Sequence, residues 1–121
     1  MRILVTGGCG YIGSALIPHL LKNNHKVISV DKQFFGNSLP KHKNLKNIKM
    51  CINDINDNHL KKVDVVMHLA AISNDPAALL NSKITWETNV LYTLKLLTIC
   101  KKNKIKKFIF ASSGSVYGIS K

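Results

Sequence analysis

Three glycines near the amino terminus constrain the fold of this chain more than any other feature. Gly7, Gly10 and Gly13 directly follow an apolar, β-branched run at residues 2–6 and open a segment with helical spacing. In such a unit the first glycine permits a tight turn, the second lets the backbone approach a pyrophosphate, and the third lets helix pack on strand. The N–H groups at the start of the helix then favour an anion without any lysine. An ordinary glycine-rich turn is the alternative, and the flanking strand and helix favour the phosphate site.

The rest of the chain alternates apolar, strand-like runs with segments of helical spacing. We expect strands at residues 2–6, 26–31, 47–52, 63–71 and 107–112, helices at 11–24, 57–62 and 75–104, and a loop at 33–46. Strands separated by helices at this spacing predict parallel βαβ units. The predicted fold class is therefore α/β, a Rossmann-like doubly wound parallel sheet of about five strands in the order 3-2-1-4-5.

Length and composition limit the organisation of the chain. Its 121 residues suit one domain, residues 1–121, and 45% hydrophobic residues are enough for a globular core rather than a disordered chain. No run approaches the roughly 18 apolar residues that a membrane span needs. The first apolar run reaches glycine too early for a signal peptide. We therefore expect a cytoplasmic protein that does not contact membranes.

The net charge of +12 raises nucleic acid as a partner. Every cation except Arg2 is a lysine, however, and the lysines are scattered from Lys22 to Lys121 among asparagines and isoleucines. A nucleic-acid binder more often shows arginines with interleaved aromatic residues. The pattern favours a solvated surface and makes nucleic acid the weaker alternative.

The cysteines and histidines indicate neither a disulfide framework nor a metal site. The three cysteines are an odd number, they form no Cys-x-x-Cys pair, and no histidine stands at ligand spacing from them. We expect reduced thiols and no bound metal.

Asp31 indicates which dinucleotide the glycine loop would take. It stands 18 residues after Gly13, at the end of the second expected strand. An acid at this place accepts hydrogen bonds from both hydroxyls of the adenosine ribose and repels a 2′-phosphate, so NAD is favoured over NADP. The neighbouring cation Lys32 could tolerate that phosphate, which keeps NADP as the alternative.

Five signatures spread over the chain resemble the extended short-chain dehydrogenase/reductases, and within them the NAD-dependent epimerase/dehydratases that act on nucleotide sugars. The signatures are the loop at 6–13, Asp31, the pair Asp54-Ile55, the segment 68–71 (His-Leu-Ala-Ala) and the segment 111–118 (Ala-Ser-Ser-Gly-Ser-Val-Tyr-Gly). The resemblance covers essentially the whole chain. It implies that the backbone of Tyr11 and Ile12 touches the pyrophosphate, that Asp31 holds the ribose, and that Asp54 and Ile55 flank the adenine.

The resemblance also implies which residues lie along the path to the nicotinamide. Leu69, Ala70 and Ala71 would line this path, and the two small side chains would let the cofactor lie close. Asn89, within the long expected helix, matches a further family position and joins the expected cofactor-binding residues.

For catalysis, the resemblance assigns to Ser113 the hydrogen bond to the reacting sugar hydroxyl or carbonyl. The family's proton acceptor is a tyrosine in a Tyr-x-x-x-Lys helix, where the lysine lowers the phenol's pKa. Tyr117 and Lys121 have this spacing, but Tyr117 belongs to the Val-Tyr-Gly signature only four residues after Ser113, and the family's catalytic tyrosine stands on a later, separate helix. We therefore expect neither Tyr117 nor Lys121 to be catalytic.

The leading hypothesis is thus a truncated, NAD-binding portion of a nucleotide-sugar epimerase/dehydratase-type oxidoreductase, without a substrate domain and without catalysis of its own. The alternatives are a free-standing NAD-binding module, half of a split enzyme completed by a partner chain, and a basic nucleic-acid-associated protein. A nucleotide sugar would bind only after completion by another chain. The expected fifth strand would be an unpaired apolar edge, which favours self-association or pairing with a partner.

Overall fold

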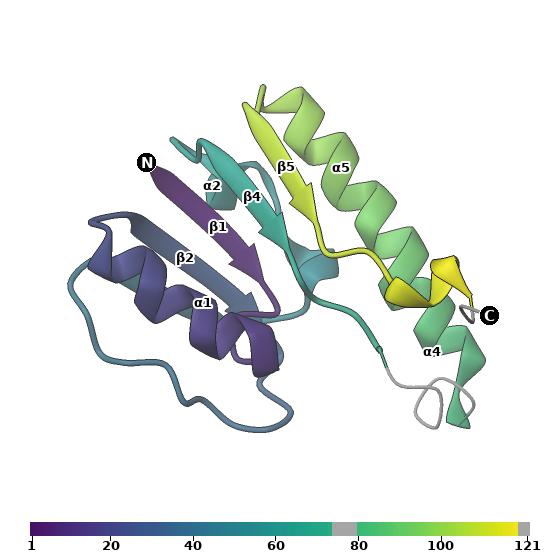
Figure 1. Ribbon diagram of the computed structural model, residues 1–121. Coiled ribbons are helices and arrows are strands. Elements are labelled where there is room, and N and C mark those ends of the chain that lie inside the picture. Colours follow the sequence, from purple (N-terminus) through teal and green to yellow (C-terminus); the bar gives the residue numbers. More distant parts are fainter. Residues whose placement is uncertain (74–79, 119–121) are drawn as a thin grey trace.

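A five-stranded parallel sheet organises the chain (Figure 1). The computed structural model describes residues 1–73 and 80–118. The strands are β1 (Arg2–Thr6), β2 (Lys26–Asp31), β3 (Leu45–Lys49), β4 (Val65–His68) and β5 (Lys107–Phe110). Their order is β3-β2-β1-β4-β5, and each neighbouring pair is parallel. This confirms the predicted Rossmann-like class and strand order.

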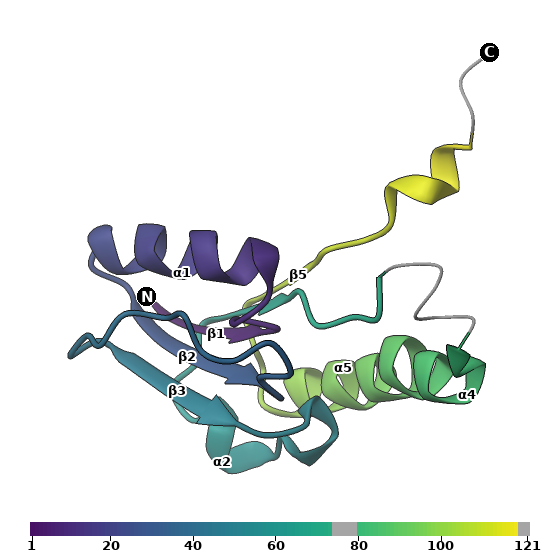
Figure 2. The same cartoon turned by 90° about the horizontal axis from the view of Figure 1, so that it is seen from below.

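Helices cover the two faces of the sheet unequally. On one face lies α1 (Tyr11–Lys22), and on the other lie α2, α4 and α5 (Figure 2). The remaining helical elements are η1 (Ile52–Asp54), α2 (Asp57–Leu60), α4 (Ser82–Trp86), the π-helical turn η2 (Glu87–Leu91), α5 (Tyr92–Lys102) and the 3₁₀ turn η3 (Gly114–Tyr117). No helix in the described part of the chain combines the length and apolarity needed to span a membrane.

Two apolar clusters, one on each face, hold these layers together. Ile3 and Val5 of β1 pack with Ile17 of α1, whereas Leu4 between them packs with Leu96 of α5. The alternation follows from the two-residue period of a strand. Because both faces of β1 are covered, its central residues are at most 1% exposed, as expected for an inner parallel strand. Burial of each such side chain contributes about 1.5–3 kcal/mol.

The third strand begins and ends earlier in the sequence than predicted. It occupies Leu45–Lys49 instead of residues 47–52. Ile48, Met50 and Ile52 alternate as in a strand, but β2 ends at Asp31, whose partner in the ladder is Lys49. The N–H of Met50 still donates to the carbonyl of Asp31 at 3.0 Å, but no residue of β2 follows Asp31, so Ile52 enters η1 and buries its side chain in the core instead.

The single long helix expected at residues 75–104 is divided in the structure. Residues 75–79 lie outside the described residues. Asn81 caps α4, its side chain accepting the N–H of Ile84 at 3.0 Å, and the π-helical turn η2 then joins α4 to α5. A single π turn within a helix is often found at functional sites. Here the turn contains Asn89, whose role is described below.

Candidate functional site

The glycine loop lies at the carboxyl end of β1 and is shaped by two requirements at Gly7. Its φ of 73° lies in the left-handed region, which is costly for residues with a Cβ. A Cβ there would also stand 2.7 Å from the backbone nitrogen of Ala70 and 2.9 Å from the carbonyl carbon of Leu69. Only glycine lets the loop lie directly on the segment that follows β4. The N–H of Gly7 donates to the carbonyl of Val30 at 2.9 Å and ties the loop to β2 as well.

The start of α1 presents free N–H groups beside this loop. Gly10 is the N-cap without a side-chain cap, and its own N–H donates to the carbonyl of Gly7 at 3.2 Å. Within the described residues, the N–H groups of Tyr11, Ile12 and Gly13 have no acceptor. Tyr11 is 95% exposed, so this end of the helix is open. Unpaired N–H groups at an open helix start form an anion site.

Gly13 fixes how closely the helix approaches the loop. A Cβ on Gly13 would stand 2.6 Å from the Cα of Gly8 and would also overlap the carbonyl oxygen of Gly7. The third glycine of the motif therefore allows close packing, as the sequence predicts, but of the helix on the loop that follows β1 rather than on the strand itself. Gly8 is constrained too, since a Cβ there would lie 2.8 Å from the side chain of Ile17.

Asp31 lies at the carboxyl end of β2, next to the loop. Its carboxylate accepts the N–H of Cys9 at 3.0 Å through one oxygen and the N–H of Gln33 through the other. An ionised carboxylate offers about four acceptor positions. About two acceptor positions therefore remain open, and the two backbone hydrogen bonds hold the carboxylate in place.

Asp54 and Ile55 have different surroundings. Asp54 is exposed at the end of η1, whereas Ile55 is only 2% exposed and belongs to the core with Leu4 and Leu96. The ammonium of Lys95 on α5 donates to the backbone carbonyl of Asn53 at 2.6 Å and so fastens η1 to the helix. The side chain of Ile55 is therefore part of the core and is not available for contact with a ligand.

A buried chain of hydrogen bonds, which the sequence analysis did not identify, links the ends of β1 and β4 to α5. Nδ1 of His68 lies 2.6 Å from the hydroxyl of Thr6, and its Nε2 lies 2.8 Å from the hydroxyl of Thr93. Thr93 donates to the carbonyl of Asn89 at 3.0 Å, so it accepts the Nε2 proton of His68. Thr6 then donates to Nδ1 and accepts the N–H of Ala70 at 3.4 Å. Every proton of the chain therefore points from Ala70 toward Asn89.

The imidazole of this chain is neutral. His68 is 1% exposed, and burial lowers its pKa from 6.5 to about 4. Its ring stacks on Phe110 of β5 with centroids 5.6 Å apart. A histidine after a strand and two threonines give no periodic signal in a sequence, which explains why sequence reasoning does not find the cluster.

Asn89 acts on the backbone that follows β4. Its side-chain oxygen accepts the N–H of Ile72, and its side-chain nitrogen donates to the carbonyl of Ile72, both at 2.9 Å. The side-chain amide thus clamps the segment that holds Leu69, Ala70 and Ala71. The sequence-based expectation placed Asn89 among the cofactor-binding residues, and the structure shows it positioning that segment.

The residues that the sequence analysis considers for catalysis, Ser113, Tyr117 and Lys121, follow β5 in the sequence. Ser113 is exposed, and Tyr117 is 88% exposed at the end of η3, which projects away from the sheet (Figure 2). Gly118, with a φ of 68°, follows it in the left-handed region, and Lys121 lies outside the described residues. The described residues include no group of three or more potential metal ligands, and Cys9, Cys51 and Cys100 are free thiols.

The glycine loop, the open helix start and Asp31 together define a Rossmann-like fold of the dinucleotide-binding type. The model of the NAD dependent epimerase/dehydratase family matches residues 3–121, and the chain belongs to this family. The resemblance inferred from the sequence is confirmed. The family's dependence on NAD agrees with the cofactor predicted from Asp31.

Individual relatives support the same assignment. A putative UDP-glucose 4-epimerase of Methanocaldococcus jannaschii is 40% identical over 96% of this chain and 39% of its own length. The structure of UDP-N-acetylglucosamine 4-epimerase from Methanobrevibacter ruminantium M1, in complex with UDP-N-acetylmuramic acid, is 37% identical, with a TM-score of 0.89 over 98% of this chain and 40% of that one. The UDP-glucose 4-epimerase of Thermus thermophilus, in complex with NAD, is 29% identical, with a TM-score of 0.83 over 94% of this chain and 38% of that one. The chain therefore spans about two fifths of the length of these relatives.

Proposed function

We propose that this chain is the amino-terminal, NAD-binding portion of a nucleotide-sugar epimerase/dehydratase-type oxidoreductase, and that it does not catalyse by itself. In this proposal residues 1–121 form one domain. The observation that carries the proposal is the open start of α1, where Tyr11, Ile12 and Gly13 offer N–H groups without acceptors beside a loop that excludes side chains.

The residues of this chain would hold the cofactor along the carboxyl ends of the strands. The diphosphate would lie against the N–H groups of Tyr11, Ile12 and Gly13, and the remaining acceptor positions of Asp31 would take the ribose hydroxyls. NAD fits better than NADP because a 2′-phosphate would meet that carboxylate. When bound, the cofactor supplies hydride transfer at its nicotinamide ring.

Two further groups of residues would complete the cofactor site. We assign the adenine to the surface beside Asp54 and Ile55, where η1 is fastened to α5. The nicotinamide would lie along Leu69, Ala70 and Ala71, a segment that Gly7 approaches closely and that Asn89 anchors at the following residue, Ile72. Asn89 contributes by fixing the path of the chain.

The absence of catalysis is proposed from the surroundings of Tyr117. Ser113 follows β5 and would place a substrate hydroxyl or carbonyl, a role that does not itself transfer a proton. Tyr117 stands on an exposed 3₁₀ turn that is followed by a residue in the left-handed region, not within a continuous α-helix. A Tyr-x-x-x-Lys pair meets only on a formed helix, which supports assigning no catalysis to Tyr117 and Lys121.

A second candidate is half of a split enzyme, and the edge strand favours it. β5 is the last strand in the order of the described sheet, and its Ile109 and Phe110 are 42% and 52% exposed. An exposed apolar edge strand invites pairing with another strand. In this version a partner chain pairs with β5, or a second copy does, and a nucleotide sugar binds only in the completed assembly.

The free thiols agree with a cytoplasmic location, which we also propose.

The proposal is tested by titrating the 121-residue chain with NAD in a calorimeter. Asp31→Ala should weaken binding by about tenfold or more, because the carboxylate supplies two charge-assisted hydrogen bonds. Asp57→Ala is the matched control, since it removes the same group from a surface ion pair with Lys102. Tyr117→Phe should leave binding unchanged.

Turnover of UDP-glucose is measured in parallel and should be absent for the chain alone. Equal NAD affinity in the wild type and the Asp31 variant would remove the ribose assignment. Turnover by the isolated chain would contradict the absence of catalysis. Turnover that appears only with a second chain would favour the split enzyme.

A further inference from the structure

Two adjoining hollows lie at the amino-terminal ends of β1 and β2, at the opposite end of the sheet from the glycine loop. Their volumes are about 350 and 240 Å³. Arg2, Ile28 and Lys46 line both of them, so the two hollows adjoin, and together they are called the depression below. Neither includes a residue assigned above to the cofactor. Any function of this depression is therefore separate from the proposed NAD site.

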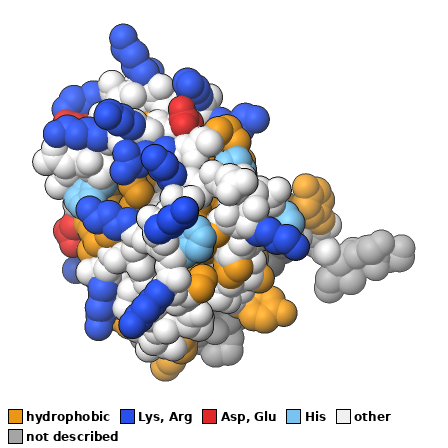
Figure 3. All heavy atoms as spheres, turned by 90° about the vertical axis from the view of Figure 1, so that its left-hand side faces the viewer, with side chains coloured by type: hydrophobic (Ala, Val, Ile, Leu, Met, Phe, Trp, Pro, Cys, Tyr) orange, Lys and Arg blue, Asp and Glu red, His pale blue; other side chains and the backbone are white. Residues whose placement is uncertain are grey.

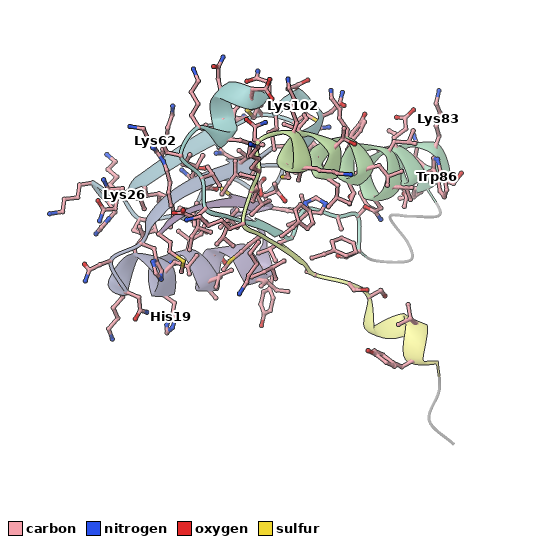
Figure 4. All side chains as sticks on the ribbon, turned by 90° about the horizontal axis from the view of Figure 1, so that it is seen from above. His19, Lys26, Lys62, Lys83, Trp86 and Lys102 are labelled. Carbon is pink, nitrogen blue, oxygen red and sulfur yellow. The ribbon has the colours of Figure 1, made fainter. Side chains whose placement is uncertain are left out.

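The lining of the depression is cationic and carries no compensating acid. Among the described residues, no Asp, Glu, Phe, Tyr or Trp lines either hollow. The six cations of the lining are Arg2, Lys26, Lys43, Lys46, Lys61 and Lys62. None of these lysines forms an ion pair within the described chain. Figure 3 shows Lys and Arg side chains gathered on this side of the molecule, and Figure 4 shows Lys26 and Lys62 at the same end.

One nitrogen of the Arg2 guanidinium, in the lining of both hollows, lacks a partner within the described chain. Nε of Arg2 is buried and has no hydrogen-bond acceptor in the described chain. The carboxylate of Asp64 contacts the same residue, but its oxygens accept the backbone N–H of Arg2 at 2.9 Å and the ammonium of Lys106 at 3.2 Å. A buried charged donor without an acceptor is costly. A ligand that supplies acceptor oxygens would remove this cost.

We infer that this depression binds a small ligand with two or more phosphate groups. A guanidinium and several ammonium groups around a concave surface match the charge and the acceptor oxygens of such a ligand. The volume suits a small molecule. A nucleic-acid strand is the less suitable occupant, because the described lining offers no Phe, Tyr or Trp ring on which bases could stack. Its apolar floor of Ile28 and Ile48 gives the ligand a partly desolvated surface.

Tripolyphosphate is the probe for this site, and two double variants test it. Lys46→Gln with Lys62→Gln removes two charges from the lining and leaves Arg2 and the core of β1 intact. Lys83→Gln with Lys101→Gln removes the same charge from α4 and α5, and Figure 4 shows Lys83 at the far end of the molecule. Affinities are measured by calorimetry on the 121-residue chain at low ionic strength. Amide shifts of the ¹⁵N-labelled chain locate the bound probe.

The lining variant should bind tripolyphosphate about tenfold more weakly than the wild type, whereas the control should stay within about twofold. The amides of Arg2 and Lys46 should shift on binding. Equal weakening of both variants would reduce the effect to net charge and overturn the inference. So would shifts confined to Gly10–Gly13, which would report only the glycine loop. Binding of duplex DNA without binding of tripolyphosphate would also overturn it, in favour of a nucleic-acid surface.

Discussion

Replacing Thr93 by valine tests the buried hydrogen-bond chain through His68. The substitution keeps the shape of the side chain but removes the acceptor of the Nε2 proton. Because His68 is 1% exposed, water cannot replace that acceptor, and an unsatisfied buried donor costs about 1–3 kcal/mol. We expect the free energy of unfolding to fall by about 2 kcal/mol, which corresponds to a urea midpoint lower by about 1 M.

The chain contains a matched control on the same helix. The hydroxyl of Thr98 donates to the carbonyl of Leu94 at 2.9 Å, as that of Thr93 donates to the carbonyl of Asn89 at 3.0 Å, but Thr98 is exposed and no histidine donates to it. Thr98→Val should change the free energy of unfolding by no more than about 0.5 kcal/mol. Both variants are measured by urea denaturation at pH 7. Equal destabilisation would show that the back-bond to the helix, and not His68, accounts for the effect, and the reasoning would be refuted.

Three further outcomes follow from the described contacts. Gly7→Ala should lower the melting temperature more than Gly36→Ala, because both positions have positive φ but, of the two, only Gly7 would bring a Cβ within 3 Å of backbone atoms. Equal decreases in the melting temperature would count against the steric argument. Burial lowers the pKa of His68 to about 4, below its unfolded value of 6.5, so the contribution of the neutral imidazole to stability is complete above pH 6.5 and is lost as the pH falls toward 4. A midpoint near pH 6.5 in an NMR titration of His68 would contradict this. Burial raises the pKa of the Cys100 thiol to about 11, so Cys100 should react with iodoacetamide at pH 8 only as fast as the chain unfolds. Rapid labelling of Cys100 in the native chain would contradict this.

The sequence is sufficient for the parts of the fold that have strong local signals. β1 and β2 have the bounds that the sequence predicts, because continuous β-branched runs bounded by glycine or a charge leave little choice. Gly7 and Gly13 of the glycine loop are predictable, since a Cβ at either position would overlap backbone atoms. The end of β3 could not be predicted from its own residues. It depends on where β2 stops offering hydrogen bonds, which is a property of the partner strand.

In the candidate site, the sequence predicts a residue's position only where that position follows from the residue's own strand or loop. Asp31 could be placed because it ends a strand at a fixed distance from the loop. The contact of Asn89 with Ile72 and the cluster of Thr6, His68 and Thr93 join segments 17 to 62 residues apart. No spacing in the sequence encodes such contacts. The π turn that contains Asn89 is likewise invisible to a search for helical periodicity.

The one-way order of protons through His68 determines where acid acts first. An imidazolium donates from both nitrogens, so once His68 is charged the hydroxyl of Thr6 must point its proton elsewhere. Thr6 is fully buried, and within the described chain no other acceptor is recorded for that proton. The free-energy cost of protonating His68 therefore arises at Thr6, the last residue of β1, immediately before Gly7. Acid should therefore weaken the turn at Gly7 before the rest of the sheet unfolds.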